Sequence, residues 1–417
     1  MKSLFQPQLF IALIALLFAQ GSSAQTWIPQ TSGTTMKLWK VQFLDANTGY
    51  ASGDSGTVIK TSDGGTTWNA VNISTVYAVR DIYFVSATEG WAAVGDVDSS
   101  STSGEIWHTT NGGTAWTAQT PSTTEARLGI SFADANTGWA VGSKNGPINI
   151  DATTNGGTLW SNQTDNNIFG WLYKVDAVST TTAYAIGVTF FPSATGFVVK
   201  TTDGGANWAQ NSTGTIANPN DIDMIDSAMG FVAGDGGMIL ATINGGTNWN
   251  TRTSGTTDTL MGVSFTDASR GWICGYSGTI IRSTDSGMTW GPETSGTSQN
   301  LNSVFGLDTT TAWAVGDNGT IRKRVSGTGV KSIANSHVDC RVYPNPFNNT
   351  TTLSIPDNVD LQDAVLYLHD AMGKVVMQQY IPAHSATLRR GHIAAGTYSY
   401  RIFNAGRNIA SGKIIIE

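Results

Sequence analysis

The sequence has 417 residues, of which 48 are glycine, 11 are proline and only 13% are charged, and its formal net charge is −7. This length exceeds one typical domain, and a composition rich in glycine and poor in charge favours short strands and tight turns. Two cysteines without a CxxC or CxxH motif, and a single histidine (His108) before residue 330, nearly exclude zinc sites and Ser-His-Asp relays there, so we expect no metal and no cofactor.

The chain begins with a segment typical of a secretory signal peptide, residues 1–24. It contains Lys2, an apolar run over residues 9–18 and a small-residue step that ends at Ala24. That run is too short for a membrane span, and no later stretch approaches 18 apolar residues. We predict cleavage after Ala24 and an exported chain without an integral membrane segment.

An eight-residue motif, Ser/Thr-x-Asp/Asn-x-Gly-x-x-Trp, occurs six times. Successive tryptophans of the motif lie 48, 44, 48, 41 and 41 residues apart. Repeats of this length are typical of propellers and solenoids, in which one unit cannot bury its own apolar face. The motif occupies residues 61–68, 109–116, 153–160, 201–208, 242–249 and 283–290.

Between these motifs the sequence repeats a longer pattern of short strands. In the first unit, runs at 41–43, 49–53 and 57–60 are separated by turn residues and lead into the motif. A small residue followed by an aromatic one opens the second strand of seven units. These pairs are Gly49-Tyr50, Gly90-Trp91, Gly138-Trp139, Ala183-Tyr184, Gly230-Phe231, Gly271-Trp272 and Ala312-Trp313.

The seventh unit lacks the motif, and the start of the mature chain supplies what it lacks. Residues 301–324 contain three strands and no closing tryptophan, whereas residues 27–33 repeat the phrase that follows the motif in other units. Pairing residues 26–33 with the last unit leaves no unpaired sheet edge at the junction. We therefore predict an all-β fold with a seven-bladed propeller over 25–328, closed by an N-terminal strand.

The motif reads as a structural turn between the third and fourth strands of a blade. Its Asp or Asn accepts backbone N–H bonds, its glycines supply positive φ and its Trp packs on the blade. Three of the six Asp/Asn positions carry asparagine, whose amide cannot act as a general acid or base. This excludes a catalytic role for the set. The residues are Asp63, Trp68, Asn111, Trp116, Asn155, Trp160, Asp203, Trp208, Asn244, Trp249, Asp285 and Trp290.

The composition changes near residue 329. We interpret residues 329–340 as a linker and residues 341–417, with at least five strand-like runs and no tryptophan, as a small β-sandwich.

The repeats resemble a known propeller family. The motif is similar to the bacterial neuraminidase repeat, or Asp-box, and its alternation with phrases such as Gly138–Gly142 and Ala312–Gly316 resembles the family of the photosystem II stability and assembly factor. The resemblance extends from Thr26 to about Arg324. It implies a propeller fold and, for photosynthetic members, a role as an assembly factor.

The tail resembles the type A C-terminal sorting domain of the type IX secretion system. The similar phrases are Tyr343–Phe347, Leu368–Lys374, Ala395–Arg401 and Gly412–Ile416. The resemblance implies export across both membranes and recognition by the type IX secretion machinery. The expected location is extracellular or attached to the outer-membrane surface.

Two enzyme classes share Asp-box propellers and have to be weighed against a binding protein. A sialidase site needs three arginines and a Tyr/Glu pair, but the repeat region has seven arginines and four glutamates in total. Xyloglucan hydrolases of this kind pair two propellers. We therefore expect a non-enzymatic module that binds a protein or a glycan. Alternatives are an assembly factor, or a glycosidase that uses innermost-strand aspartates such as Asp81, Asp176, Asp221 and Asp223.

Charge and loop position narrow the expected site. Residues 25–328 carry 14 basic and 24 acidic side chains, net −10, which predicts no binding to nucleic acid and favours a basic partner or a neutral glycan. The candidate ligand-binding residues lie where the chain enters innermost strands: Trp39, Arg80, Arg127, Trp171 and Tyr173. Trp39 and Trp171 could instead fill the core.

Two long loops on the same side, 95–104 and 187–196, add Asp96, Asp98, Phe190 and Phe191. The Asp96-x-Asp98 pair could hold calcium, but such a pair is more often a solvated loop. Phe190 and Phe191 could pack within their own loop.

Overall fold

A computed structural model describes residues 26–96, 103–142, 146–163, 165, 167–189, 194–212, 217–325, 340–357, 359, 361–370, 373–404 and 407–417. The predicted signal peptide, residues 329–339 of the predicted linker, and Asp98, Phe190 and Phe191 lie outside these ranges. The chain divides into two compact units between Gly329 and Val330. In the described residues, no helix is long and apolar enough to cross a membrane.

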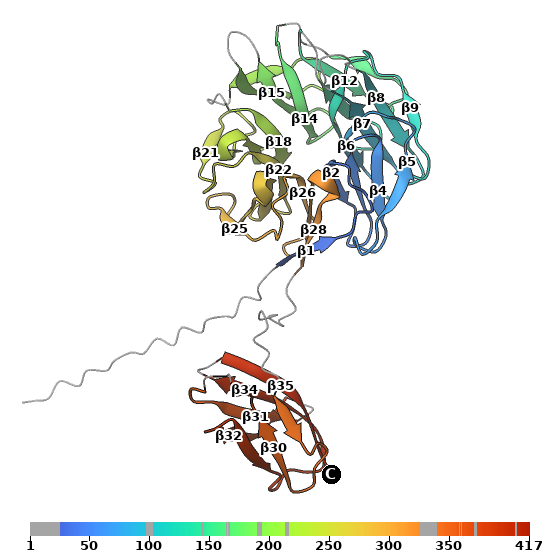
Figure 1. Cartoon of the computed structure of the whole chain (residues 1–417). Coiled ribbons are helices and arrows are strands. Elements are labelled where there is room, and N and C mark those ends of the chain that lie inside the picture. The colour runs from blue at the N-terminus through green and yellow to red at the C-terminus, as the bar shows by residue number, and fades with distance from the viewer. Residues whose placement is uncertain are drawn as a thin grey trace, which may run out of the picture. The chain divides into compact units, whose positions relative to one another are not determined.

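Within its described part, the first unit consists of seven four-stranded antiparallel sheets, the blades, arranged around a centre (Figure 1). The innermost strands are β2 (Leu38–Phe43), β6 (Val79–Phe84), β10 (Arg127–Phe132), β14 (Trp171–Ala177), β18 (Pro219–Met224), β22 (Leu260–Phe265) and β26 (Leu301–Gly306). The second strands are β3 (Gly49–Gly53), β7 (Gly90–Gly95), β11 (Gly138–Gly142), β15 (Ala183–Thr189), β19 (Gly230–Gly234), β23 (Gly271–Gly275) and β27 (Ala312–Gly316).

The third strands are β4 (Thr57–Thr61), β8 (Gly104–Thr109), β12 (Asn149–Thr153), β16 (Thr195–Thr201), β20 (Met238–Thr242), β24 (Ile280–Ser283) and β28 (Ile321–Val325). The outer strands are β5 (Asn69–Asn72), β9 (Thr117–Gln119), β13 (Ser161–Asn162), β17 (Ala209–Ser212), β21 (Asn250–Arg252), β25 (Gly291–Glu293) and β1 (Thr26–Gln30). Short 3-10 turns join second and third strands at η1 (Asp235–Gly237), η2 (Tyr276–Gly278) and η3 (Asp317–Gly319).

The ring is closed by the first described strand. β1 pairs antiparallel with β28, so that Trp27 lies opposite Arg324. Trp27 is 4% exposed and its indole N–H donates to Glu293 Oε2 of the preceding blade at 2.8 Å, while Glu293 forms an ion pair with buried Arg324 at 2.9 Å. The prediction of a seven-bladed propeller closed by an N-terminal strand is confirmed.

The small residue that opens each second strand pairs with the last residue of the innermost strand before it, and the sizes of the two side chains are related. A Cβ on Gly49 would lie 2.5 Å from the Phe43 ring, which covers this position and stacks on Trp313 of the neighbouring blade at 3.5 Å. Where the innermost strand ends in a small residue, the opening residue is alanine: Ala177 lies opposite Ala183, and Gly306 lies opposite Ala312. The aromatic stacks between blades therefore explain the repeated sequence pair.

The Asp-box forms the turn between the third and fourth strands. Asp63 accepts the backbone N–H of Thr67 at 2.8 Å and the hydroxyl of Thr61 at 2.8 Å, and Gly64 and Gly65 have φ of 69° and 89°. An asparagine performs the same role through its amide oxygen, as Asn111 does. The equivalent positions are Asn155, Asp203, Asn244 and Asp285, and the box tryptophans Trp68, Trp160, Trp208 and Trp290 are buried, whereas Trp116 and Trp249 are partly buried.

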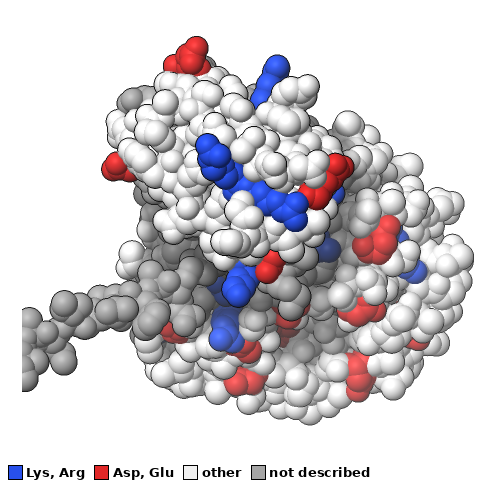
Figure 2. Space-filling view, turned by 90° about the horizontal axis from the view of Figure 1, so that it is seen from below, with Lys and Arg blue, Asp and Glu red and all other residues white. Residues whose placement is uncertain are grey.

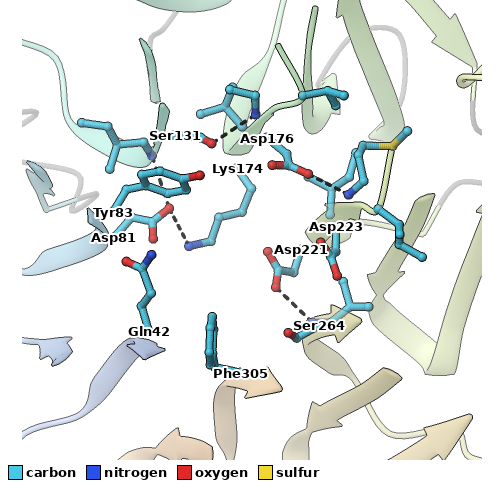
Figure 3. A pocket seen from close by; sticks show the side chains of 18 of the residues that line it. Gln42, Asp81, Tyr83, Ser131, Lys174, Asp176, Asp221, Asp223, Ser264 and Phe305 are labelled. Atoms are coloured by element: carbon cyan, nitrogen blue, oxygen red, sulfur yellow. Dashed lines mark hydrogen bonds and ion pairs between the residues drawn. The ribbon is translucent and has the colours of Figure 1, made fainter. Parts of the chain in front are cut away.

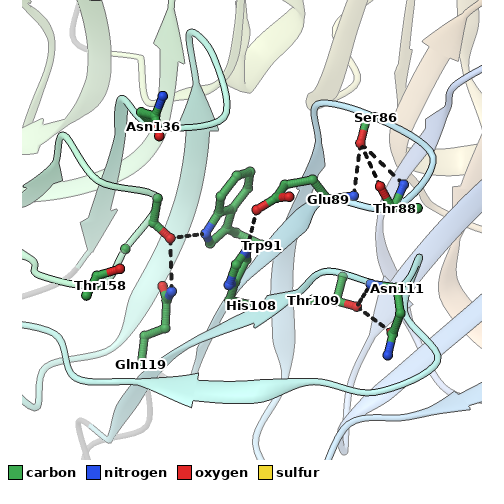
Figure 4. A network of polar contacts seen from close by, with 12 residues as sticks. Ser86, Thr88, Glu89, Trp91, His108, Thr109, Asn111, Gln119, Asn136 and Thr158 are labelled. Atoms are coloured by element: carbon green, nitrogen blue, oxygen red, sulfur yellow. Dashed lines mark hydrogen bonds and ion pairs between the residues drawn. The ribbon is translucent and has the colours of Figure 1, made fainter.

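The box turn also joins neighbouring blades. The carbonyl of Gly156 accepts hydrogen bonds from Trp91 and Gln119 of the preceding blade, both at 3.1 Å (Figure 4). In the same way Gly112 accepts bonds from Tyr50 and Lys60. Each such carbonyl connects one blade to the next.

The second unit is a sandwich of two sheets. One contains β29 (Arg341–Tyr343), β30 (Thr350–Ser354) and β33 (Ser385–Arg389), and the other contains β32 (Val375–Tyr380), β31 (Val365–His369), β34 (Gly396–Asn404) and β35 (Arg407–Ile416). Alternate residues of β30 are buried, as expected for a strand with one face on the core. The predicted small β-sandwich is confirmed.

Candidate functional site

The antiparallel blades give the propeller two distinct faces. The entry face carries the segments that lead into the innermost strands and the turns between second and third strands. The box face carries the Asp-box turns and the turns between first and second strands. The predicted ligand-binding residues lie at the start of innermost strands, on the entry-face side.

All seven innermost strands have a register shift of one residue near their start. It follows the first pair with the second strand in six of them, as between Leu38 and Lys40, and the second pair in β14. A β-bulge of this kind re-aims the extra side chain. The seven extra residues, together with Lys174, line a pocket of about 210 Å³, here called the mouth pocket. These residues, the mouth ring, are Trp39, Arg80, Leu128, Tyr173, Asn220, Met261 and Asn302.

Four of the ring residues are held by an aspartate that follows the second strand of their own blade. Trp39 donates its indole N–H to Asp54 at 2.6 Å, and Asn220 donates to Asp235 at 3.0 Å. Asn302 donates to Asp317 at 3.2 Å, and Arg80 lies 3.8 Å from Asp96. The Arg80 guanidinium also stacks over the Trp39 ring at 4.3 Å. The mouth pocket is therefore pre-organised.

The structure brings three of the five predicted ligand-binding residues together in the mouth ring: Trp39, Arg80 and Tyr173. Trp171 is partly buried at the start of β14 and does not line the pocket. Arg127 requires a correction, because its side chain is fully buried and ion-paired with buried Asp151. Its guanidinium holds the preceding loop and is closed off from any ligand, so Leu128 takes its place in the ring.

The other four ring residues could not be predicted from residue type, because none is aromatic or an arginine. Leu128, Asn220, Met261 and Asn302 belong to neither class. The available signal was positional, because each occupies the second place of an innermost strand that aligns across the repeats.

A larger cavity of about 730 Å³ lies along the centre and reaches turns of the box face at residues 178–179 and 225–227 (Figure 3). It brings together all four aspartates of the glycosidase alternative, Asp81, Asp176, Asp221 and Asp223. Lys40 and Lys174 also line it, and Lys174 lies 3.1 Å from Asp81. We call it the central cavity.

Each of these four carboxylates accepts a backbone N–H from the next blade. The donors are Ile130 to Asp81 at 3.2 Å, Met224 to Asp176 at 2.7 Å, Val263 to Asp221 at 3.0 Å and Phe265 to Asp223 at 2.6 Å. Uncharged residues serve the same purpose elsewhere, as Ser131 and Ser264 do. Because the central edge of an innermost strand has no pairing strand, these acceptors satisfy its N–H groups.

Burial shifts the titration of the central carboxyl groups. Burial, and then the charge of Asp176, raise the pKa of Asp223 to about 8, and burial raises the pKa of Asp176 to about 6. Burial lowers the pKa of Lys40, but the surrounding aspartates, Asp81 first, outweigh that effect and raise it. In the described residues, no three His, Cys, Asp or Glu side chains group as a metal site.

Charged side chains are sparse on the visible surface. Figure 2 shows acidic and basic residues scattered among uncharged ones, in keeping with 13% charged residues in the sequence.

Comparison with solved structures places the propeller among known ones. A YCF48 structure with a bound D1 peptide superposes with a TM-score of 0.58 at 18% identity, covering 74% of this chain and 99% of that one. YCF48 from Cyanidioschyzon merolae gives 0.58 at 20% identity, covering 72% and 98%. A GH74 xyloglucanase from Xanthomonas campestris gives 0.58 at 11% identity, covering 79% and 59%. At these identities the likeness concerns the fold alone.

Sequence comparisons identify the second unit. The comparison with curated proteins found no match. Residues 341–417 match the family model of the secretion system C-terminal sorting domain, which indicates export by the type IX system to the cell surface or beyond. The chain is thus a seven-bladed β-propeller that carries a secretion system C-terminal sorting domain.

Proposed function

We propose that this chain is an exported, non-enzymatic binding protein that recognises a protein or a glycan through the mouth pocket. The observation that carries the proposal is the mouth ring, in which every blade contributes one bulged residue to the same hollow. Two aromatic side chains, Trp39 and Tyr173, come from different blades and face this hollow together. Aromatic residues held in a central pocket are the usual anchors of a binding surface.

The proposal predicts that truncation of the two aromatic residues weakens ligand binding without unfolding the propeller. We expect the Trp39→Ala, Tyr173→Ala double variant to lose affinity about tenfold or more. The measurement is a screen of glycan and protein arrays with the wild-type chain, followed by titration of each hit. The matched control is Leu159→Ala with Met288→Ala, because both residues are exposed on the box face. A ligand that binds all three forms equally contradicts the site.

A second candidate function is glycoside hydrolysis in the central cavity. The observation in its favour is the convergence of four carboxyl groups, one of which, Asp223, has a pKa raised to about 8 and so retains a proton at neutral pH. A protonated acid beside a second carboxyl group is what glycoside hydrolysis requires. Against it, all four carboxylates already serve backbone N–H groups of the next blade.

This second candidate predicts turnover that depends on the cavity. On a panel of polysaccharides, Asp223→Asn is expected to lower the rate by a factor of about 100 or more, since it removes the acid. Asp203→Asn, in an Asp-box turn, is the control. Turnover that survives in both Asp223→Asn and Asp176→Asn would come from another site.

A further inference from the structure

The partner class follows from the chemistry of the mouth pocket, given the proposed function. The donors of its two asparagines are already engaged: Asn220 also donates to the carbonyl of Leu260 at 2.9 Å, and Asn302 donates to that of Leu38 at 2.9 Å. The indole N–H of Trp39 is bound to Asp54. A glycan would bring hydroxyl groups that need partners, whereas an apolar side chain needs only the aromatic and aliphatic surface that remains.

Aspartates behind the ring add carboxylates next to a pocket whose lining also holds two cations, Arg80 and Lys174. Four aspartates each contact a ring residue: Asp54, Asp96, Asp235 and Asp317. The tryptophan and asparagine donors are uncharged, so their hydrogen bonds do not neutralise the carboxylates that accept them. Lys37 pairs with Asp317 and Arg80 with Asp96. In the described residues neither Asp54 nor Asp235 forms an ion pair within 4.0 Å, although the charge of Arg80 acts on Asp54 at longer range.

The entry face carries further exposed apolar side chains outside the pocket. Four large hydrophobic side chains from different loops are exposed there: Met36 at 41%, Val76 at 79%, Phe169 at 55% and Tyr276 at 42%. A partner that only filled the pocket would leave them in water. Their spread over several blades suits a partner with a broad surface, such as a folded protein or a long peptide segment.

From these observations we infer that the partner is a protein segment with a large apolar or aromatic side chain flanked by lysine or arginine. The apolar side chain enters the mouth pocket between Trp39 and Tyr173. The basic residues on either side face the carboxylates of Asp54 and Asp235. Such a charge arrangement chiefly raises the association rate and selects the partner, and salt weakens it.

The test is selection of a random peptide library, displayed on phage, against the full-length protein. Enriched peptides are expected to carry an aromatic or large aliphatic residue next to Lys or Arg, and to bind Trp39→Ala about tenfold more weakly. Asp54→Asn with Asp235→Asn should weaken binding about threefold to tenfold at low salt, because both substitutions remove the charge. The amide at position 54 keeps the bond from Trp39, and the amide at position 235 keeps one of the two bonds from Asn218 and Asn220.

The matched control is Asp203→Asn with Asp285→Asn, which removes the same charge from the box face. Asparagine already occupies three equivalent box positions, so these turns are preserved. Enriched peptides that are acidic, or that lose equal affinity in the two charge variants, overturn the basic partner.

A glycan array separates this inference from the proposed function. Glycans that bind in a Trp39-dependent way, when no peptide does, overturn a protein partner but retain the mouth pocket as the site. If neither peptides nor glycans distinguish wild type from Trp39→Ala, the proposed function fails as well. The melting temperature of each variant shows whether lost binding comes from unfolding.

Discussion

At the scale of single residues, burial at the centre of the ring gives the central aspartates two properties. Their carboxyl groups accept backbone N–H bonds, and the pKa of some of these groups is raised. The free edge of an innermost strand needs acceptors for its N–H groups, and Asp223 provides one for Phe265 at 2.6 Å. The same burial that makes this hydrogen bond necessary also raises the pKa of the carboxyl group to about 8. Asp176 follows the same logic, with a pKa of about 6.

This residue chemistry predicts a pH-dependent stability. Between about pH 4 and about pH 8 the unfolded chain releases the Asp223 proton while the folded chain keeps it, so the folded state binds more protons and loses stability as pH rises. We expect the melting temperature to fall between pH 5 and 8, and Asp223→Asn to flatten this slope. Asp203→Asn should leave the slope unchanged, because the pKa of Asp203 is lowered to about 2 by hydrogen bonds from Asn207. An unchanged slope in Asp223→Asn would contradict the raised pKa.

At the scale of elements, the closing strand β1 has only five residues but completes the last blade of the ring. It supplies the outer strand of the last blade, where Trp27 lies opposite Arg324 and belongs to the same buried hydrophobic cluster as Trp272. The opposite face of the strand is exposed, with Ile28 at 41%. Loss of Trp27 is expected to weaken the pairing that joins the two ends of the propeller sequence.

The closure predicts a large difference between two neighbouring substitutions on β1. Trp27→Ala should lower the free energy of unfolding by about 3–5 kcal/mol, since it leaves a cavity and removes a partner of Glu293. Ile28→Ala should change it by less than about 1 kcal/mol. Thermal unfolding of the two variants measures this, with about 2–4 °C per kcal/mol expected. Equal, small effects would show that the strand does not hold the ring closed.

The turns, the closing strand and the bulges show which structural features could be predicted from the sequence and which could not. The box turns and the closing strand were predictable because positive-φ glycines, Asp or Asn acceptors and a repeated phrase such as Trp27–Gly33 have direct structural causes. The bulges were not, since a one-residue register shift follows from the geometry of neighbouring strands. Arg127 was therefore predicted to bind a ligand, although the bulge turns Leu128 to the pocket and buries Arg127 against Asp151.

At the scale of the whole molecule, repetition builds two different faces from one pattern. The box face repeats turns that connect blades, as Gly156 does with Trp91. The entry face repeats a bulge whose side chain differs from blade to blade, and this variation is what a binding site needs. The sorting domain adds a separate function, export, that the propeller does not share.

The central claim is that the entry face, through its mouth pocket, is where this exported protein meets its partner. The most direct measurement places a photo-crosslinking amino acid at Tyr173 and, in a second variant, at Leu159 on the box face. Both forms are exported by the native cells, irradiated and examined for crosslinked species. We expect a discrete crosslinked partner from position 173 and none from position 159. A partner captured equally from both positions, or from position 159 alone, would contradict it.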